Sequence, residues 1–125
     1  MADSGKSILC IDDDPDILEF FETVLNAKGY EVVTAPTAEE GLKAFKEYSP
    51  GLVFVDLMME EVDAGTNFVK EVKALGSGVP IYMVSSVGDA LNLNTSYSEL
   101  GLTGVLQKPV DISNLLQIVQ RSVGE

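Results

Sequence analysis

Five short runs of apolar residues alternate along the chain with longer segments in which apolar residues recur every three or four positions. Runs this short, rich in Ile, Val, Leu and Phe, are typical of strands that are buried on both faces of a parallel sheet. The longer segments have the spacing of helices that bury one face. The predicted strands are the apolar part of Ser7–Asp14, then Glu31–Ala35, Leu52–Asp56, Ile81–Ser85 and Gly104–Gln107.

Capping residues mark the first two predicted helices. Asp14 is a short acceptor suited to an N-cap and Pro15 suits the first turn, so a helix is expected to begin there and to end at Gly29. Thr37 is expected to cap the second helix, with Glu40 three residues later completing a capping box. Each predicted helix therefore follows a predicted strand.

Three further helices follow from the same periodicity. One is expected near Thr66–Leu75 and one across Gly88–Leu100, where polar residues weaken the helical propensity. The last is expected after Asp111, which caps it. The apolar stripes expected to be buried are Phe68, Val69, Val72 and Leu75 in the third helix, and Ile112, Leu115, Leu116, Val119 and Val123 in the last.

The alternation predicts an α/β domain in which five helices cover both faces of a five-stranded parallel sheet. Right-handed crossovers, with one reversal of direction after the second strand, give the strand order 2-1-3-4-5. A chain of 125 residues has the size of one domain, so residues 1–125 are expected to form a single unit.

Charged residues follow three of the predicted strands. Asp12 and Asp13 follow the first, Asp56 ends the third, and Lys108 follows the fifth. The carboxyl ends of parallel strands share one edge of the sheet, so these side chains are expected to meet there. Clustered carboxylates repel one another unless a cation lies among them. We expect Asp13, Asp56 and the Met58 carbonyl to bind Mg²⁺ directly, and Asp12 to act through a water.

The composition limits the classes of partner. The net charge of −12 argues against direct binding to nucleic acid, which requires a basic face. Cys10 is the only cysteine, so no internal disulfide can form, and its place in an apolar run predicts a buried side chain. No apolar segment reaches the ~20 residues of a membrane span, and the polar start lacks a signal-peptide core, so a cytoplasmic protein is expected.

Four motifs resemble those of the receiver domains of two-component response regulators. They are ILCIDDDP, LVFVDLMM, PIYMVSS and LQKPVD, in the family's order, and the resemblance spans Ser7–Val123. It implies a flavodoxin-like, doubly wound fold of the chemotaxis-regulator type. It also implies that Asp56 is the phosphoryl acceptor of a phosphorelay.

The resemblance assigns roles to the other site residues. It implies that Asp12 and Asp13 form the acidic pair that binds Mg²⁺. Ser85 is similar to the hydroxyl residue that responds to phosphorylation, and Lys108 to the lysine that ends the fifth strand. In this family the bond between Lys108 and Pro109 is cis.

The resemblance also implies the partners. The phosphoryl donor would be a sensor histidine kinase or a histidine phosphotransfer protein, and the reaction would be self-phosphorylation and autodephosphorylation, without turnover as an enzyme. A downstream protein would bind the face made by the fourth helix, the fifth strand and the fifth helix. Two residues depart from the family: Val105 stands where a Tyr or Phe is usual, and Glu60 where a proline is common.

Two other functions are compatible with parts of the sequence. A receiver-like module could dock a partner without phosphorylation, which the departures at Val105 and Glu60 would permit. A magnesium phosphatase of the haloacid-dehalogenase type uses an Asp-x-Asp motif after a strand, which Asp12 and Asp14 match. That enzyme family needs a longer chain and a second acidic motif late in the sequence, and Asp111 alone is not one.

Overall fold

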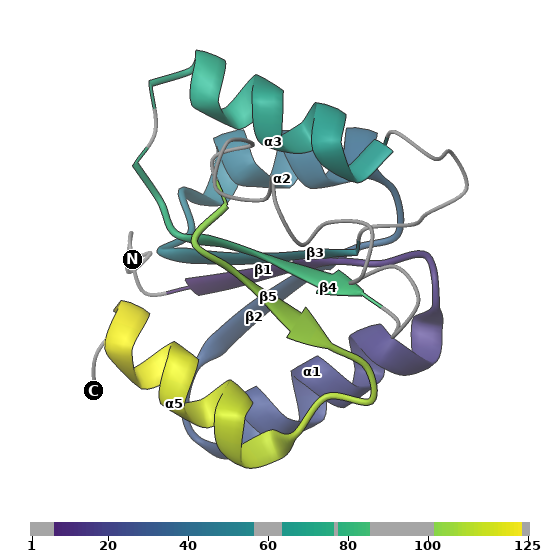
Figure 1. Ribbon diagram of the computed structural model, residues 1–125, viewed down its shortest axis with the longest axis vertical. Helices are drawn as coiled ribbons and strands as arrows, with labels where there is room; N and C mark the ends of the chain where they lie inside the picture. Colours follow the sequence, from purple (N-terminus) through teal and green to yellow (C-terminus); the bar gives the residue numbers. More distant parts are fainter. Residues whose placement is uncertain (1–6, 57–63, 77, 86–101, 124–125) are drawn as a thin grey trace.

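The computed structural model describes residues 7–56, 64–76, 78–85 and 102–123. These residues form one parallel sheet of five strands in the order β2-β1-β3-β4-β5 (Figure 1), as predicted. The strands are β1 (Ser7–Ile11), β2 (Glu31–Ala35), β3 (Leu52–Asp56), β4 (Ile81–Ser85) and β5 (Gly104–Gln107).

Helices cover both faces of the sheet. Figure 1 shows α2 and α3 on one face and α1 and α5 on the other. The helix expected across 88–100 lies outside the described residues. The described helices are α1 (Pro15–Ala27), α2 (Ala38–Tyr48), α3 (Ala64–Ala74) and α5 (Ile112–Val123). None of them is long and apolar enough to cross a bilayer.

The predicted caps begin the first two helices. The Asp14 side chain accepts a hydrogen bond from the Asp16 backbone N–H, and the Thr37 hydroxyl accepts one from the Glu40 N–H at 3.1 Å. Each bond satisfies one of the N–H groups that lack a partner in the first turn of a helix. Gly29, just beyond α1, has a φ of 90°, a conformation that glycine adopts without steric cost.

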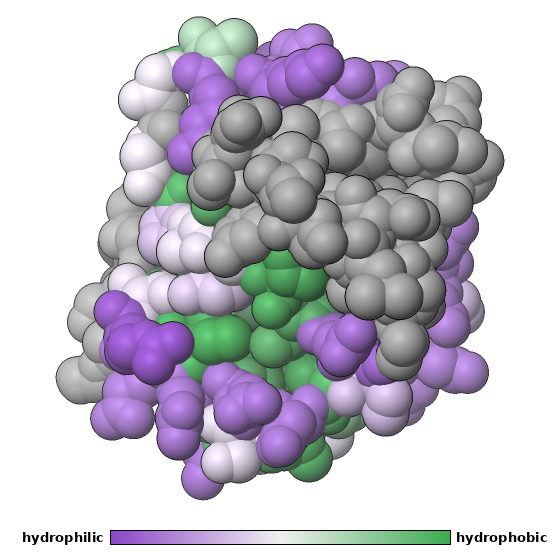
Figure 2. Space-filling model, viewed as in Figure 1, coloured by the Kyte–Doolittle hydropathy of each residue, from purple (hydrophilic) through white to green (hydrophobic). Residues whose placement is uncertain are grey.

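Two apolar layers hold the sheet between the helices. Alternate residues of the central strands point to opposite faces, so Ile11 and Val55 pack toward α2 and α3, whereas Cys10 and Phe54 pack toward α1 and α5. Cys10 is fully buried, as predicted, and the Phe54 ring stacks on Phe21 with centroids 5.1 Å apart. In Figure 2, hydrophobic residues also gather on the surface between β5 and α5.

The periodicity mispredicted two side chains. Leu75 is 54% exposed, because it lies beyond Ala74, the last residue of α3, where helical spacing no longer applies. Ile112 is 48% exposed at the first residue of α5. The third helix also begins two residues before Thr66, at Ala64.

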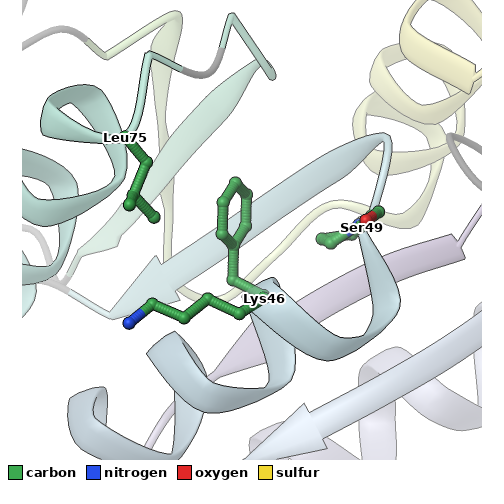
Figure 3. Close-up of a pocket in the computed structure, with 5 residues that line it drawn as sticks. Lys46, Ser49 and Leu75 are labelled. Carbon is green, nitrogen blue, oxygen red and sulfur yellow. The ribbon is translucent and has the colours of Figure 1, made fainter.

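Leu75 borders a shallow groove between the last turns of α2 and α3 (Figure 3). Phe45, Lys46, Ser49 and Pro50 line the rest of it, and its volume is about 360 Å³. The groove lies near the edge of the sheet where strands begin, because Pro50 and Gly51 lead directly into β3. It is therefore separated by the length of the strands from the edge that carries the acidic residues.

The aromatic stack should carry a large share of the stability. Phe54→Ala leaves a cavity beside Phe21 and should lower the free energy of unfolding by about 3–5 kcal/mol. The control Ile112→Ala removes a half-exposed side chain and should change it by less than about 0.5 kcal/mol. Urea unfolding of both variants measures the difference. Equal effects of the two substitutions would contradict this assignment of the core.

Candidate functional site

The site residues lie at the edge of the sheet where three strands end. Ile11 pairs with Val55 in the parallel register, so Asp12, the next residue, lies level with Asp56 on the neighbouring strand. The Asp12 backbone N–H donates to the Ala35 carbonyl at 3.1 Å, which ties the end of β1 to β2. The register of the sheet thereby brings together carboxylates that are far apart in sequence.

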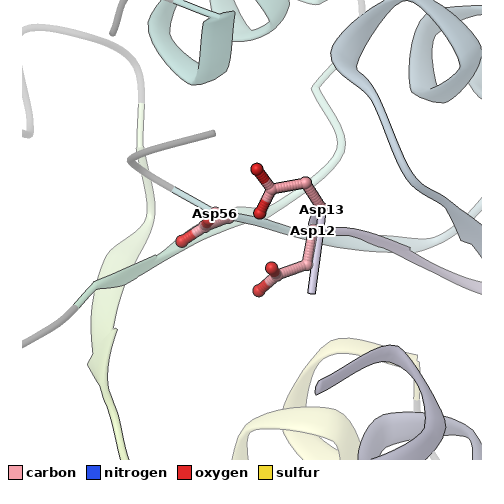
Figure 4. Close-up of side chains that lie close together, drawn as sticks. All are labelled: Asp12, Asp13 and Asp56. Carbon is pink, nitrogen blue, oxygen red and sulfur yellow. The ribbon is translucent and has the colours of Figure 1, made fainter. Parts of the chain in front are cut away.

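Three carboxylates converge on one small space. One oxygen from each of Asp12, Asp13 and Asp56 lies within 4.8 Å of the others, and Figure 4 shows the three side chains pointing into the same region. Asp12 and Asp56 are buried, with 2% and 4% of their surface exposed, whereas Asp13 is exposed. The cluster therefore has a buried floor and one side open to solvent.

Lys108 crosses to this cluster from the end of β5. Its ammonium nitrogen lies 3.2 Å from Asp12 Oδ2 and 3.3 Å from Asp56 Oδ1, and it donates a hydrogen bond to Asp56. The peptide bond between Lys108 and Pro109 is cis, as the resemblance implied. One ammonium is shared by two buried carboxylates, so the cluster keeps an excess of negative charge.

The pKa values reflect this excess of negative charge. Burial, followed by the charge of Asp12, raises the pKa of Asp56 to about 6, although Lys108 opposes the change. Burial also raises the pKa of Asp12, against a hydrogen bond from the Asp14 backbone N–H and the charge of Lys108. Burial lowers the pKa of Lys108, but Asp12 and Asp56 together outweigh it and raise the value. Both carboxylates would be stabilised by another cation.

The donor set fits a hard divalent cation. Asp12 Oδ1 accepts a hydrogen bond from the Asp14 N–H at 2.9 Å, but Asp12 Oδ2 is buried and has no hydrogen-bond partner with good geometry among the described residues. Lys108 is the ion-pair partner of this oxygen at 3.2 Å, and the three carboxylates together offer the oxygen ligands that Mg²⁺ prefers. The open side at Asp13 leaves room for the waters that Mg²⁺ keeps.

The structure unites the four charged residues that the sequence placed at this edge: Asp12, Asp13, Asp56 and Lys108. The backbone of Ser85 ends β4 opposite Gln107, one residue before Lys108. Met58 and Glu60 lie outside the described residues.

Asp14 does more than begin α1. Besides capping α1, Asp14 donates its backbone N–H to Asp12. The Asp-x-Asp spacing could have indicated this contact, because an aspartate often accepts a hydrogen bond from the backbone two residues later. The turn after β1 therefore orients Asp12 as well as starting the helix.

Val105 lies on the other side of the sheet from the aromatic stack. It is opposite Met83 in the register and packs, partly buried, with the apolar layer that faces α2 and α3. Val105 stands where receiver domains usually have an aromatic residue, so a smaller side chain within an apolar layer occupies that position.

The family model, a curated relative and a solved structure all match this chain over most of its length. The family model for the response regulator receiver domain matches residues 8–120. The chain is 39% identical over 109 residues to the probable transcriptional regulator ycf27 of Cyanophora paradoxa, covering 87% of this chain and 44% of that protein. The crystal structure of a response regulator receiver domain protein from Clostridium thermocellum superposes with a TM-score of 0.83 at 29% identity, covering 98% and 94% of the two chains.

The curated relatives are much longer than this chain. The transcriptional regulatory protein GlrR of Escherichia coli is 31% identical over 119 residues, which cover 95% of this chain but 26% of GlrR. The shared part of these relatives is therefore the α/β unit that carries the acidic cluster.

The raised pKa of Asp56 predicts a specific dependence of stability on pH. The folded protein holds this proton more tightly than the unfolded chain, so the carboxylate should destabilise the metal-free protein increasingly as the pH rises from about 4 to about 6. Asp56→Asn should therefore stabilise the protein near pH 7 by about 1–3 kcal/mol, the upper value corresponding to the whole change in pKa.

Urea unfolding of both proteins in EDTA, from about pH 4 to pH 8, measures this difference. The gain from Asp56→Asn should shrink as the pH falls through about 6 toward about 4, where Asp56 is protonated in the folded state. A gain that is constant over this range would contradict the electrostatic account of the cluster.

Proposed function

The chain belongs to the response regulator receiver domain family, and we propose that Asp56 accepts a phosphoryl group from a phosphohistidine donor in a reaction that requires Mg²⁺. The donor would be a sensor histidine kinase or a histidine phosphotransfer protein. The domain would modify itself and later lose the phosphoryl group to water, without turning over a small-molecule substrate.

The position of the Lys108 side chain is the observation that best supports this proposal. Its side chain is 21% exposed and reaches two buried carboxylates, at 3.2 and 3.3 Å, rather than extending into solvent. A lysine in that place can balance the charge of an anion that arrives at Asp56. Two buried carboxylates that share one ammonium form a site suited to the transfer of a charged group. Carboxylates that only cap helices or lie on the surface would not need to be buried around a lysine.

The transfer requires little covalent chemistry from the protein beyond one nucleophile. An oxygen of the ionised Asp56 carboxylate would attack the donor phosphorus, forming an O–P bond while the N–P bond of the phosphohistidine breaks. The electron pair of that bond returns to the imidazole nitrogen. Lys108, which already contacts Asp56 Oδ1, would then pair with the new negative charge on the phosphoryl oxygens.

Asp12, Asp13 and Asp56 would hold the Mg²⁺, with the Met58 carbonyl and waters as the further ligands expected from the sequence. When bound, the ion supplies positive charge that reduces repulsion between the carboxylates and the incoming phosphoryl group. Asp12 is fixed for this role by the hydrogen bond from the Asp14 N–H. The exposed carboxylate of Asp13 lies on the side open to solvent.

The output surface is proposed to include β5 and α5. Hydrophobic residues gather between these elements in Figure 2, and an exposed apolar surface of this kind is typical of a protein interface. The backbone of Ser85 ends the strand beside β5, so the response to phosphorylation that the sequence predicts for Ser85 would reach this region first. With a net charge of −12, a protein is a more suitable partner for this domain than nucleic acid.

Intact mass spectrometry tests the phosphoacceptor role. Wild-type protein incubated with acetyl phosphate and Mg²⁺ should gain one phosphoryl group, because Asp56 is the nucleophile. Asp56→Asn should gain none, and EDTA should abolish the gain in the wild type. Asp16→Asn, a change at an exposed carboxylate of α1, is the control that should leave phosphorylation intact. A folded wild-type protein without an adduct would favour a module that docks its partner unphosphorylated.

Mg²⁺ should stabilise the folded protein, because only the folded chain assembles the three carboxylates. At a Mg²⁺ concentration about 100 times the dissociation constant, the gain should be about 2.7 kcal/mol. Asp13→Asn should remove most of this gain without disturbing the buried floor of the site. Thermal unfolding with and without Mg²⁺ measures both effects, and an equal gain in wild type and Asp13→Asn would place the metal elsewhere.

A further inference from the structure

Gly41 occupies an unexpected place in the interior of a helix. It is the fourth residue of α2 and it is buried, and its N–H donates to the Thr37 carbonyl as in any helix. Glycine is unfavourable within a helix because it loses more backbone freedom than alanine on folding. The positive φ values of the described glycines belong to Gly29 and Gly76, so the helical backbone at Gly41 does not require glycine. The reason must lie in the space around it.

The Ile11 side chain fills the space that a Cβ at Gly41 would need. A Cβ placed there would overlap Ile11 Cδ1, would lie 2.8 Å from Ile11 Cγ1, and would lie 3.4 Å from Ile11 Cγ2. Real Cβ atoms essentially never lie as close to another heavy atom as the contacts with Cδ1 and Cγ1 would require. The absence of a side chain at position 41 therefore lets α2 lie directly against the end of β1.

Ile11 connects this contact to the acidic cluster. It is the last residue of β1, 1% exposed, and it pairs with both Ala35 and Val55 at the centre of the sheet. The next residue is Asp12, whose oxygens contact Lys108 and the Asp14 N–H. Ile11 and Asp12 share a peptide bond, so a shift of Ile11 that involves its backbone would also move Asp12.

We propose that Gly41 is a positioning residue for the acidic site, because it leaves room for Ile11 and so fixes the backbone on which Asp12 and Asp13 stand. The proposal deepens the proposed function and rests on it. Metal and phosphoryl sites tolerate displacements of only about 0.5 Å in their ligands. An added methyl group at position 41 must shift either Ile11 or α2, so it should weaken the site from a distance.

Calorimetric titration with Mg²⁺ provides the main test. Gly41→Ala should weaken Mg²⁺ binding about tenfold, the lower end of the effects seen when residues behind metal ligands are changed. Its rate of phosphorylation by acetyl phosphate should fall in parallel. An unchanged affinity in folded Gly41→Ala would contradict the proposal.

Gly104 offers a matched control for a loss of packing alone. A Cβ at Gly104 would lie 2.9 Å from Tyr82 Cε2, so Gly104→Ala should also lower the unfolding temperature. Gly104 is the first residue of β5, so it lies where the strands begin, whereas the carboxylates lie where the strands end. The Mg²⁺ affinity of Gly104→Ala should remain that of the wild type. An equal loss of affinity in Gly104→Ala and Gly41→Ala would show a general effect of destabilisation and would overturn the proposal.

Shortening Ile11 should rescue the effect. Ile11→Val removes Cδ1, the atom nearest the added methyl group, so Gly41→Ala combined with Ile11→Val should bind Mg²⁺ more tightly than Gly41→Ala alone. Ile11→Ala removes all three close atoms. In that background Gly41→Ala should leave the affinity unchanged or improve it, and this comparison decides the question even if Gly41→Ala alone fails to fold. A further loss there would contradict the proposal.

The wild-type and variant results together distinguish a failure of the proposed function from a failure of the role of Gly41. A wild-type protein that binds no Mg²⁺ would contradict the proposed function and this inference together. Wild-type binding and phosphorylation that Gly41→Ala leaves intact would contradict the inference alone.

Discussion

The shared ion pair between one ammonium and two buried carboxylates is the constraint on which the site depends. Asp12 and Asp56 are both buried, and Lys108 lies within 3.3 Å of each of them. Burial and mutual repulsion raise the pKa of Asp56 to about 6, so the fold holds its central carboxylate in an unfavourable electrostatic state. Such a site gains free energy when a further cation enters, and the same cation prepares it for a phosphoryl group.

The sheet makes this arrangement possible. Its parallel register sets Asp12 beside Asp56, and the bond from the Asp12 N–H to Ala35 fixes the end of β1. The apolar layers on both faces keep the strand ends in place, since a packed core transmits small displacements instead of absorbing them. The proposed role of Gly41 follows from the same property, because α2 rests directly on Ile11, one residue before the cluster.

The fold was predictable because its signals are local. Asp14 and Thr37 mark helix starts, and runs such as LVFVD mark buried strands, so the strand order and the convergence of four charged residues followed from general rules of α/β topology. The errors arose at the ends of helices, where helical spacing no longer determines which side chains are buried. Helical spacing predicted buried side chains at Leu75 and Ile112, but both lie at helix ends and are exposed. The contact of Gly41 with Ile11 has no signature in the sequence, because it depends on how closely a helix approaches a strand.

A crystal structure of the protein grown with Mg²⁺ and beryllofluoride, a mimic of the phosphoryl group, tests the central claim most directly. The account predicts the metal among Asp12, Asp13 and Asp56, the beryllofluoride on an oxygen of Asp56, and the Lys108 ammonium in contact with a fluorine. A metal bound away from these carboxylates, or an unmodified Asp56 still joined to Asp12 through Lys108, would contradict it.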